Sequence, residues 1–310
     1  MSSKNSFTPD LSVKIAGVKF KNPVIAASGT FGYGTEYEGI IDVSRLGGIC
    51  TKGLTLNPRP GNTGIRIWET PAGMLNSIGL ENPGIHAFIE NELPKMQKLG
   101  TVIIANLSGS DIEEYTEVAS ILNTSSVDMV ELNISCPNVK AGGMAFGLDE
   151  QAAASVTASV RKALTNKPLM AKLSPNAPDL TAVAYACVNA GADALSLVNT
   201  FKALAIDIKT RKLVFDNISA GLSGPAIKPI ALRMVWELCR ELKNKVPIIG
   251  MGGIACTDDA LEFLMAGAAA VQIGSATFSH PSTMIEIIDG IENYMRRLRI
   301  SSVGDIIIRD

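Results

Sequence analysis

Residues 169–199 read LMAKLSPNAPDLTAVAYACVNAGADALSLVN, and they contain one complete strand–helix–strand unit. The runs 169–174 and 194–199 are almost continuously apolar, as strands of a parallel sheet are when both of their faces are buried. Between them, Asp179 is suited to cap an amphipathic helix, and Gly191 is suited to end it. The stretch therefore predicts a parallel β–α–β unit.

The same unit recurs along the chain. Apolar runs followed by helical patterns stand at residues 23–28, 48–53, 102–107, 129–135, 169–174, 194–199, 247–252 and 270–275. Eight such units in about 250 residues are typical of a (β/α)₈ TIM barrel, an α/β fold. Residues 11–21 predict a short N-terminal hairpin that closes the bottom of the barrel, and long loops are expected after strands 2, 4 and 6. Thr257 is expected to cap the helix after the seventh strand.

Composition limits the class of protein. The chain has 310 residues, a formal net charge of −2 and 46% hydrophobic residues. This balance gives no reason to expect nucleic acid or a membrane as a partner, and no apolar run approaches the roughly 18 residues that span a bilayer. The polar N-terminus lacks the apolar stretch of a signal peptide. We therefore expect one domain over residues 1–310, located in the cytoplasm.

The spacing of the five cysteines and the glycine pattern argue against several kinds of site. The cysteines stand at positions 50, 136, 187, 239 and 256, an odd number without a CxxC pair. This spacing argues against a disulfide framework, a structural zinc site or an iron–sulfur cluster held by this chain. No GxGxxG fingerprint follows a strand with an acidic residue about 20 positions further on, so a dinucleotide site is not predicted.

Each predicted strand ends in a residue suited to ligand binding. In chain order these are Ser28, Lys52, Asn106, Asn133, Lys172, Asn199, the pair Gly252–Gly253 and the pair Gly274–Ser275. A single one of them would be an ordinary cap or turn. Because the carboxyl ends of all barrel strands meet at one mouth, the whole set predicts a ligand site there.

The chemistry of this mouth points to an anionic ligand. Barrels often bind a phosphate through backbone amides after strands 7 and 8, where Gly252–Gly253 and Gly274–Ser275 stand. Lys52 and Lys172 would be costly in an apolar mouth without negative partners. A phosphate, a substrate carboxylate or a reduced flavin would supply those partners, although lysines that extend to solvent remain an alternative.

Cys136 is the candidate general base. It stands in NISCPN at residues 133–138, past the end of the fourth strand and before Pro137, which stops a strand from continuing. Most lone cysteines are small core residues. However, His86 and His280 lie away from the strand ends, so the usual base is missing from the mouth. Cys136 is therefore the first choice as proton acceptor, and a lysine is the second.

Several motifs together resemble the dihydroorotate dehydrogenases, over essentially the whole chain. The matching stretches are ASGTFGYG at 27–34, TKGL at 51–54, NPRPG at 57–61, ETPAGMLNSIGL at 69–80, NISCPN at 133–138, GLSGPAIKP at 221–229 and GMGG at 250–253. The cysteine in NISCPN resembles class 1 members, because class 2 members have serine there. NVKAGGMAFG at 138–147 is similar to the class 1B, NAD-linked catalytic subunit.

The resemblance implies FMN in the mouth, a pyrimidine stacked on it and Cys136 as catalytic residue. Cys136 would remove a proton from C5 of dihydroorotate while C6 gives hydride to the flavin. Lys172 would stabilise the anionic reduced flavin. FMN would be held by Ser28, Lys52, Gly53, Asn106, Asn133, Lys172, Val198, Gly224, Gly252, Gly253, Gly274 and Ser275. The pyrimidine and its carboxylate would be held by Lys52, Asn76, Ser77, Ile78, Gly79, Leu80, Asn133, Asn199 and Thr200.

The resemblance also implies partners. An electron-transfer subunit carrying FAD and a [2Fe–2S] cluster would pass the electrons to NAD, with a homodimer of this chain as the core of a heterotetramer. The sequence departs from the family pattern at residues 201–203, at Ala220 and at Ser275. These departures remove no matched functional group, but they put the shape of the loop after strand 6 in doubt.

Three alternative functions stay open. A class 1A-like enzyme would pass electrons to fumarate, and a dihydropyrimidine dehydrogenase catalytic subunit would act on rings without the carboxylate. A non-catalytic barrel that binds a phosphorylated ligand would suit the glycines after strands 7 and 8, but it would leave Cys136 without a role.

Overall fold

The computed structural model describes residues 7–135, 146–243 and 245–308. Eight parallel strands close into a barrel in the order β10–β15–β16–β3–β4–β7–β8–β9. Each strand lies within the run predicted to form it, so the (β/α)₈ prediction is confirmed. Their bounds are β3 Val24–Ala26, β4 Gly48–Cys50, β7 Val102–Leu107, β8 Met129–Asn133, β9 Leu169–Lys172, β10 Ala194–Leu197, β15 Ile248–Met251 and β16 Ala270–Ile273.

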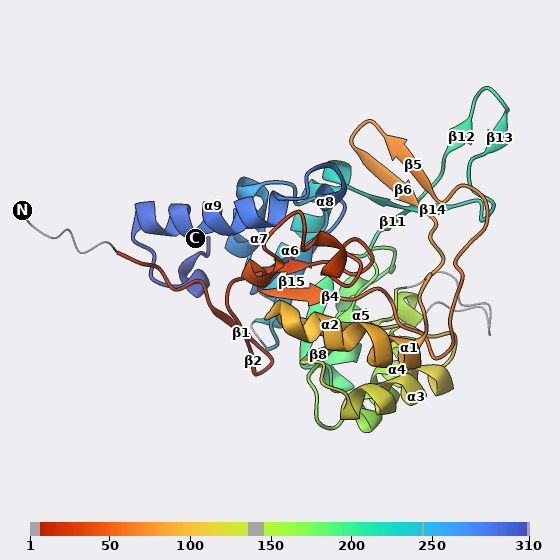
Figure 1. Cartoon of the computed structure of the whole chain (residues 1–310), viewed down its shortest axis with the longest axis horizontal. Coiled ribbons are helices and arrows are strands. Elements are labelled where there is room, and N and C mark those ends of the chain that lie inside the picture. Colours follow the sequence, from red (N-terminus) through yellow and green to blue (C-terminus); the bar gives the residue numbers. More distant parts are fainter. Residues whose placement is uncertain (1–6, 136–145, 244, 309–310) are drawn as a thin grey trace, which may run out of the picture.

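Helices cover the outside of the barrel (Figure 1). They are α1 Ile85–Ala87, α2 Leu93–Met96, α3 Ile112–Thr124, α4 Glu150–Ala163, α5 Leu180–Asn189, α6 Lys228–Leu242, α7 Thr257–Met265, α8 Ala276–Ser279 and α9 Thr283–Leu298. Short turns with 3₁₀ or π hydrogen bonding are η1 Thr35–Tyr37, η2 Val43–Arg45, η3 Phe88–Glu92, η4 Gln97–Leu99, η5 Phe146–Leu148, η6 Pro225–Ile227 and η7 Val303–Asp305.

The predicted N-caps can be compared with the observed starts of two helices, α5 and α7. Asp179 caps α5 as predicted, because its carboxylate accepts a hydrogen bond from the backbone N–H of Ala182 at 2.9 Å. The prediction for α7 is wrong by one residue, since Cys256 is its N-cap and Thr257 is the first helical residue. The reason is Asp259, whose carboxylate accepts the backbone N–H of Cys256 at 3.2 Å and so fixes the start of the helix one position earlier.

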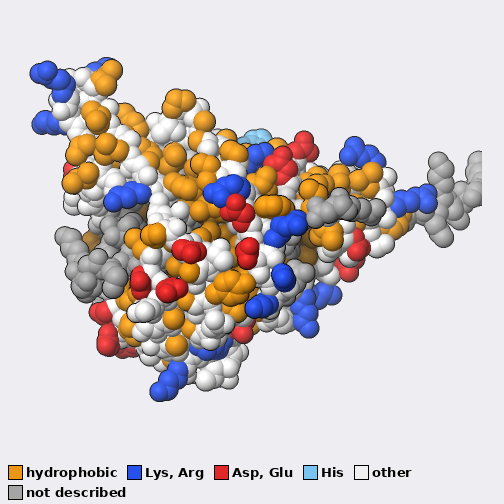
Figure 2. Space-filling view, turned by 180° about the vertical axis from the view of Figure 1, so that it is seen from behind, with side chains coloured by type: hydrophobic (Ala, Val, Ile, Leu, Met, Phe, Trp, Pro, Cys, Tyr) orange, Lys and Arg blue, Asp and Glu red, His pale blue; other side chains and the backbone are white. Residues whose placement is uncertain are grey.

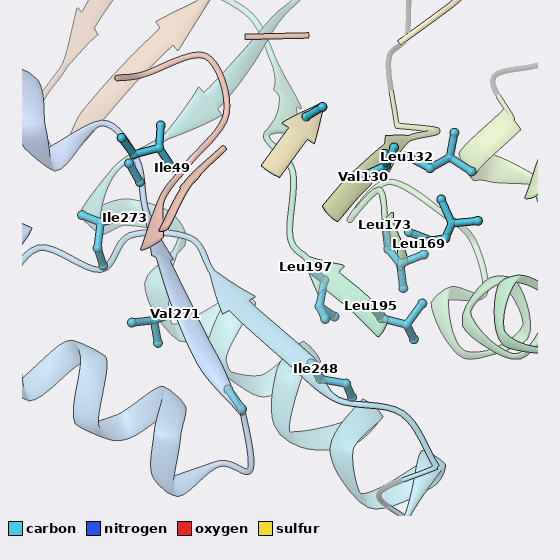
Figure 3. Packing of buried hydrophobic residues seen from close by; sticks show 14 of the residues in the cluster. Ile49, Val130, Leu132, Leu169, Leu173, Leu195, Leu197, Ile248, Val271 and Ile273 are labelled. Atoms are coloured by element: carbon cyan, nitrogen blue, oxygen red, sulfur yellow. The ribbon is translucent and has the colours of Figure 1, made fainter. Parts of the chain in front are cut away.

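Alternate residues of the barrel strands point outward and pack beneath the helices. Figure 3 shows this layer, with Val130 and Leu132 from β8, Leu195 and Leu197 from β10, and further strand residues arranged around the barrel. The intervening residues point inward, as the two-residue period of a strand requires. Near the starts of the strands they form a separate apolar cluster with the N-terminal hairpin, β1 Val13–Ile15 and β2 Val18–Phe20.

The loops after the second and sixth barrel strands join in one sheet, which the sequence did not predict. Its order is β11–β14–β6–β5, formed by β11 Phe201–Ala203, β14 Ala220–Ser223, β6 Gly73–Asn76 and β5 Ile67–Thr70. The unusual residues 201–203 thus form a strand that pairs with β14. A small hairpin of β12 Ile206–Asp207 and β13 Lys212–Leu213 follows β11. Both hairpins project from the barrel at the upper right of Figure 1.

This projecting part carries exposed apolar side chains. Ile67 of β5 is 49% exposed, and Ile208 at the tip of the small hairpin is 85% exposed. In Figure 2 the projection lies at the upper left, where hydrophobic and basic side chains are mixed. Exposed apolar groups that gather in one place are typical of protein contact surfaces. Within the described residues, no helix combines the length and the apolar character needed to cross a membrane.

Candidate active site

A buried carboxylate lies at the centre of the barrel beneath the mouth. Glu131 of β8 is completely buried. Its Oε1 accepts a hydrogen bond from Asn106 Nδ2 at 2.7 Å and one from the thiol of Cys50 at 3.3 Å. Its Oε2 accepts from Ser196 Oγ and from Gln272 Nε2, both at 2.8 Å. Side chains from four other strands therefore converge on this one acid.

Lys172 of β9 supplies the opposite charge. Its Nζ lies 3.7 Å from Glu131 Oε1, and the two side chains are 6% and 0% exposed. Burial alone would raise the pKa of Glu131, but the charge of Lys172 and the hydrogen bonds from Gln272, Ser196 and Cys50 outweigh it and leave this pKa below its ordinary value. Glu131 is therefore a buried carboxylate. Burial, with the neighbouring Glu131 charge, raises the pKa of the Cys50 thiol well above its ordinary value.

A chain of side-chain hydrogen bonds runs from Glu131 to the mouth, and the carboxylate sets which groups donate and which accept. A carboxylate only accepts, so Asn106 turns its NH₂ toward Glu131 and its Oδ1 toward Asn133 Nδ2 at 3.3 Å. Asn133 Oδ1 in turn accepts from Ser135 Oγ at 2.8 Å, and Ser135 Oγ accepts from Asn199 Nδ2. The structure thus brings three predicted strand-end asparagines together in one network with fixed donor and acceptor directions.

The predicted phosphate residues form a cradle of closely packed backbone. Gly252 and Gly253 have φ of +123° and +74°, which favour glycine. A Cβ on Gly252 would lie 3.1 Å from Val198 Cγ2, and one on Gly253 would lie 2.8 Å from the carbonyl oxygen of Gly224. Gly252, Gly253, Val198 and Gly224 are therefore immediate neighbours, and the missing side chains of the two glycines let the backbone segments pack closely together.

The other half of the cradle lies beside it on the next strand. A Cβ on Gly274 would meet nothing nearer than 3.7 Å, where Thr30 of the loop that contains Ser28 stands. Ser275 is the N-cap of the short helix α8. Glycines after strands 7 and 8 with a short helix next to them are the arrangement that barrels use for phosphate, so the residues present fit the phosphate of a flavin mononucleotide.

The loop predicted to hold the substrate lies over the mouth. A Cβ on Gly53 would lie 2.9 Å from Leu80 Cδ2 and 3.2 Å from Asn106 Oδ1, so the end of the 76–80 segment stands next to the asparagine network. Ile78 accepts the backbone N–H of Asn62 at 2.9 Å. A hydrogen bond within the loop after the second barrel strand therefore helps to hold the 76–80 segment in place.

Asn76 and Thr200 both lie next to Gly221 of the shared sheet. Asn76 Nδ2 donates to the carbonyl of Gly221 at 3.3 Å, and a Cβ on Gly221 would lie 2.2 Å from Thr200 Oγ1. Around them, the Ser77 hydroxyl accepts from Asn62 Nδ2 at 3.1 Å, and a Cβ on Gly79 would meet the Asn62 side chain. These contacts connect the loops after strands 2 and 6 at the mouth.

Lys52 is the second strand-end cation and is half-buried at the mouth. It lies close enough to Glu81, the residue after the 76–80 segment, for its charge to affect the pKa of that carboxyl group. A hydrogen bond from Arg66, 2.5 Å away, and the charges of Lys52 and Arg66 together lower the pKa of Glu81 below its ordinary value. Lys52 thus lies near the end of the 76–80 segment, which is predicted to hold the substrate.

Cys136 lies outside the described residues, so its role as base stays a prediction. The histidines are both exposed. His86 is in α1, and His280 ends α8, where its Nε2 lies 2.8 Å from Glu286.

Sequence reasoning missed Glu131 and its partners Ser196 and Gln272. The signal was present: Glu131 stands two positions before Asn133 in the run MVELN, and a charge in an otherwise apolar strand must point into the barrel on the same side. A fully buried acid of this kind is kept only when it is well hydrogen-bonded or functional.

The fold and this mouth define a (β/α)₈-barrel protein with an anion cradle and a polar, amide-lined ligand site. A family model described as dihydroorotate dehydrogenase matches residues 10–295. The chain belongs to the dihydroorotate dehydrogenase family.

Several relatives named dihydroorotate dehydrogenase B (NAD(+)), catalytic subunit, match almost the full chain. The protein of Petrotoga mobilis is 58% identical over 96% of this chain and 98% of its own. Those of Geotalea daltonii and Caldicellulosiruptor bescii are 54% and 53% identical, over 96% of this chain and 97% and 98% of theirs.

Proposed function

We propose that this chain oxidises (S)-dihydroorotate to orotate in pyrimidine biosynthesis, as an FMN-dependent catalytic subunit whose electrons pass to NAD through a partner. The names of the relatives support this function. The observation that carries it is the convergence of Asn106, Asn133 and Asn199 on one mouth that also holds Lys172 and a glycine cradle. Amide groups of this kind match the alternating N–H and C=O groups of a pyrimidine ring.

FMN would take the twelve positions named from the sequence. Gly252, Gly253, Gly274 and Ser275 would hold the phosphate, with Val198, Gly224 and Ser28 around it. Lys52, Gly53, Asn106, Asn133 and Lys172 would surround the ring system. FMN bound here supplies a two-electron acceptor. Lys172 adds a positive charge that favours the reduced, anionic form.

The substrate would lie on the flavin under the 76–80 segment, with Asn133, Asn199 and Thr200 at its amide edges. A buried amide left unpaired by a wrong ligand costs about 1–3 kcal/mol, which gives the site its selectivity. Lys52 would hold the carboxylate. Cys136 would take the C5 proton on the face opposite the flavin, so that two hydrogens leave from opposite sides.

The assembly would contain an electron-transfer subunit with FAD and a [2Fe–2S] cluster, around a core of two copies of this chain. The name "catalytic subunit" that the relatives carry supports a second subunit. The edge strand β5 with exposed Ile67 supports pairing of two copies, since an exposed apolar edge is a template for another chain. We further propose that residues 1–310 act as one domain, because β6 and β14 join both long loops in one sheet. A cytoplasmic location stays a prediction of the sequence.

Purified protein is expected to be yellow and to release FMN, about one per chain, when it is denatured. The glycine cradle has the form of a site for one phosphate group, and the sequence has no dinucleotide fingerprint. Chromatography of the released flavin is the measurement. FAD in the supernatant, or colourless protein that takes up no flavin, would contradict the cofactor assignment and favour a non-catalytic barrel.

Lys52→Ala is expected to weaken orotate binding by about 10- to 100-fold, because a hydrogen bond to a charged group contributes about 1.5–3 kcal/mol. Titration of the flavin absorbance with orotate measures this effect. Uracil, which lacks the carboxylate, should bind both proteins alike, and Lys95→Ala, an exposed lysine paired with Glu92, is the matched control. If dihydrouracil reduces the wild-type flavin as fast as dihydroorotate does, the dihydropyrimidine dehydrogenase alternative is correct.

A further inference from the structure

The proposed function does not use Glu131, the most thoroughly hydrogen-bonded acid in the described part of the barrel. It lies one layer below the mouth: in the pairing of β8 with β9, Lys172 stands opposite Asn133, two positions above Glu131. Its carboxylate accepts four hydrogen bonds and faces one cation. Substrate bound at the mouth would therefore meet the layer above it, not Glu131.

The position of this acid is costly. Removing a carboxylate and an ammonium group from water carries a large penalty, and a well-packed hydrophobic pair is often as stable or more stable. Met129 and Met170, which stand two positions before Glu131 and Lys172 on the same strands, show that the barrel interior can be filled in that way. A role in stability alone therefore does not account for the Glu131–Lys172 pair.

The geometry around the pair shows where its charge acts. At 3.7 Å, Lys172 Nζ is beyond hydrogen-bond distance of Glu131, whereas the two oxygens of Glu131 are anchored by Asn106, Ser196 and Gln272 at 2.7–2.8 Å. The carboxylate is thus the fixed member of the pair. Among the described residues, Lys172 Nζ has no acceptor within hydrogen-bond distance, so its N–H groups are available to a ligand in the mouth.

We propose that Glu131 is a positioning residue of the flavin site. Its carboxylate draws the ammonium group of Lys172 toward the barrel axis and balances the charge of that group. The reduction potential of the bound flavin is thereby held below the value that Lys172 alone would give. The inference rests on the proposed function, because it takes the ligand above Lys172 to be a flavin.

The direction of the effect follows from charge. Reduction of the flavin places negative charge in the mouth, and a cation there favours it. Glu131 opposes this effect in two ways, since its own charge repels the reduced form and its attraction holds Lys172 away. A neutral amide at position 131 would remove both effects. Each removal raises the reduction potential of the flavin, so the two contributions add.

Three variants test the proposal in the protein as purified. Glu131→Gln keeps the shape of the side chain and removes its charge, Lys172→Met removes the cation, and the double variant removes both. Glu237→Gln is the matched control, because it neutralises an exposed acid on α6 that pairs with Arg233. The readouts are the midpoint potential of the bound flavin at one pH, measured with reference dyes, and the temperature of thermal unfolding.

Glu131→Gln is expected to favour the reduced over the oxidised flavin by about tenfold, which raises the two-electron potential by about 30 mV. Lys172→Met is expected to lower the potential. Unfolding of Glu131→Gln should begin about 5–10 °C lower, because a buried cation loses its partner, and the double variant should regain most of this loss.

An unchanged potential in Glu131→Gln would overturn the inference, even if its unfolding temperature fell, because the acid would then be a core residue only. If Glu131→Gln does not fold, the double variant is compared with Lys172→Met. A smaller upward shift is then expected, because only the repulsion by the Glu131 charge is left to remove; equal potentials overturn the proposal, which includes that repulsion. Protein without flavin would overturn this inference and the proposed function together. A shifted potential in a flavin that dihydroorotate cannot reduce would overturn the proposed function alone.

Discussion

Replacing Cys136 with alanine is expected to slow reduction of the flavin by dihydroorotate by about 10²–10⁴-fold, the usual loss when a general base is removed. Neither His86 nor His280 can replace it, since both are exposed in or beside helices outside the mouth. The variant should still bind orotate and retain its flavin, because the cradle and the asparagine network are built from other residues, among them Gly252, Gly253 and Asn133. Anaerobic stopped-flow measurement of flavin bleaching gives the rate.

Cys136→Ser serves as the second variant. A serine hydroxyl is a weaker acid than a thiol, so a residual rate that rises with pH is expected. Cys256→Ala, which removes an exposed cysteine at the start of α7, should behave as wild type. A near wild-type rate in the alanine variant would move the base to a lysine, and Lys52 would be the next residue to replace.

The second large effect concerns the electron acceptor. The chain alone is expected to reduce artificial dyes with dihydroorotate but to give no measurable NADH, and addition of the electron-transfer subunit should restore NAD reduction. The physical reason is that the sequence has no dinucleotide fingerprint and no clustered cysteines for an iron–sulfur relay. Absorbance at the NADH band, with and without the partner, measures the effect.

Complex formation should accompany the restored activity. A stable interface buries about 1,200–2,000 Å² or more, so light scattering should detect an assembly larger than the chain alone. NADH production by the isolated chain would refute the need for a second subunit. Rapid turnover with fumarate by the isolated chain would instead identify a class 1A-like enzyme.

The barrel could be predicted from the sequence because its signals are local. A buried parallel strand is an apolar run, and a helix that covers it is a repeating apolar face, so each unit is visible within about 30 residues. The strand-end residues followed from the same argument, since parallel strands in a barrel must end at one rim. Asn106, Asn133 and Asn199 therefore meet in the structure as predicted.

The start of α7 is an example of a feature that local sequence patterns did not predict correctly. By residue type Thr257 is the better cap, yet Cys256 takes this position, because Asp259 bonds back to the backbone N–H groups of Ala255 and Cys256. The joined sheet of β5, β6, β11 and β14 is a larger case of the same limit. Two loops more than 100 residues apart in the chain pair there, and neither sequence contains information about the other.

By itself, then, the sequence determined the barrel, the strands that form it and the polar rim, because strand period and strand direction fix which residues reach the mouth. Only the tertiary structure decided what lies beneath that rim. Glu131 is a charge in an apolar run until the closed barrel surrounds it with Asn106, Ser196, Gln272 and Lys172 from four other strands. The partners of a buried charge are set by closure of the whole sheet, a long-range property that no local pattern contains.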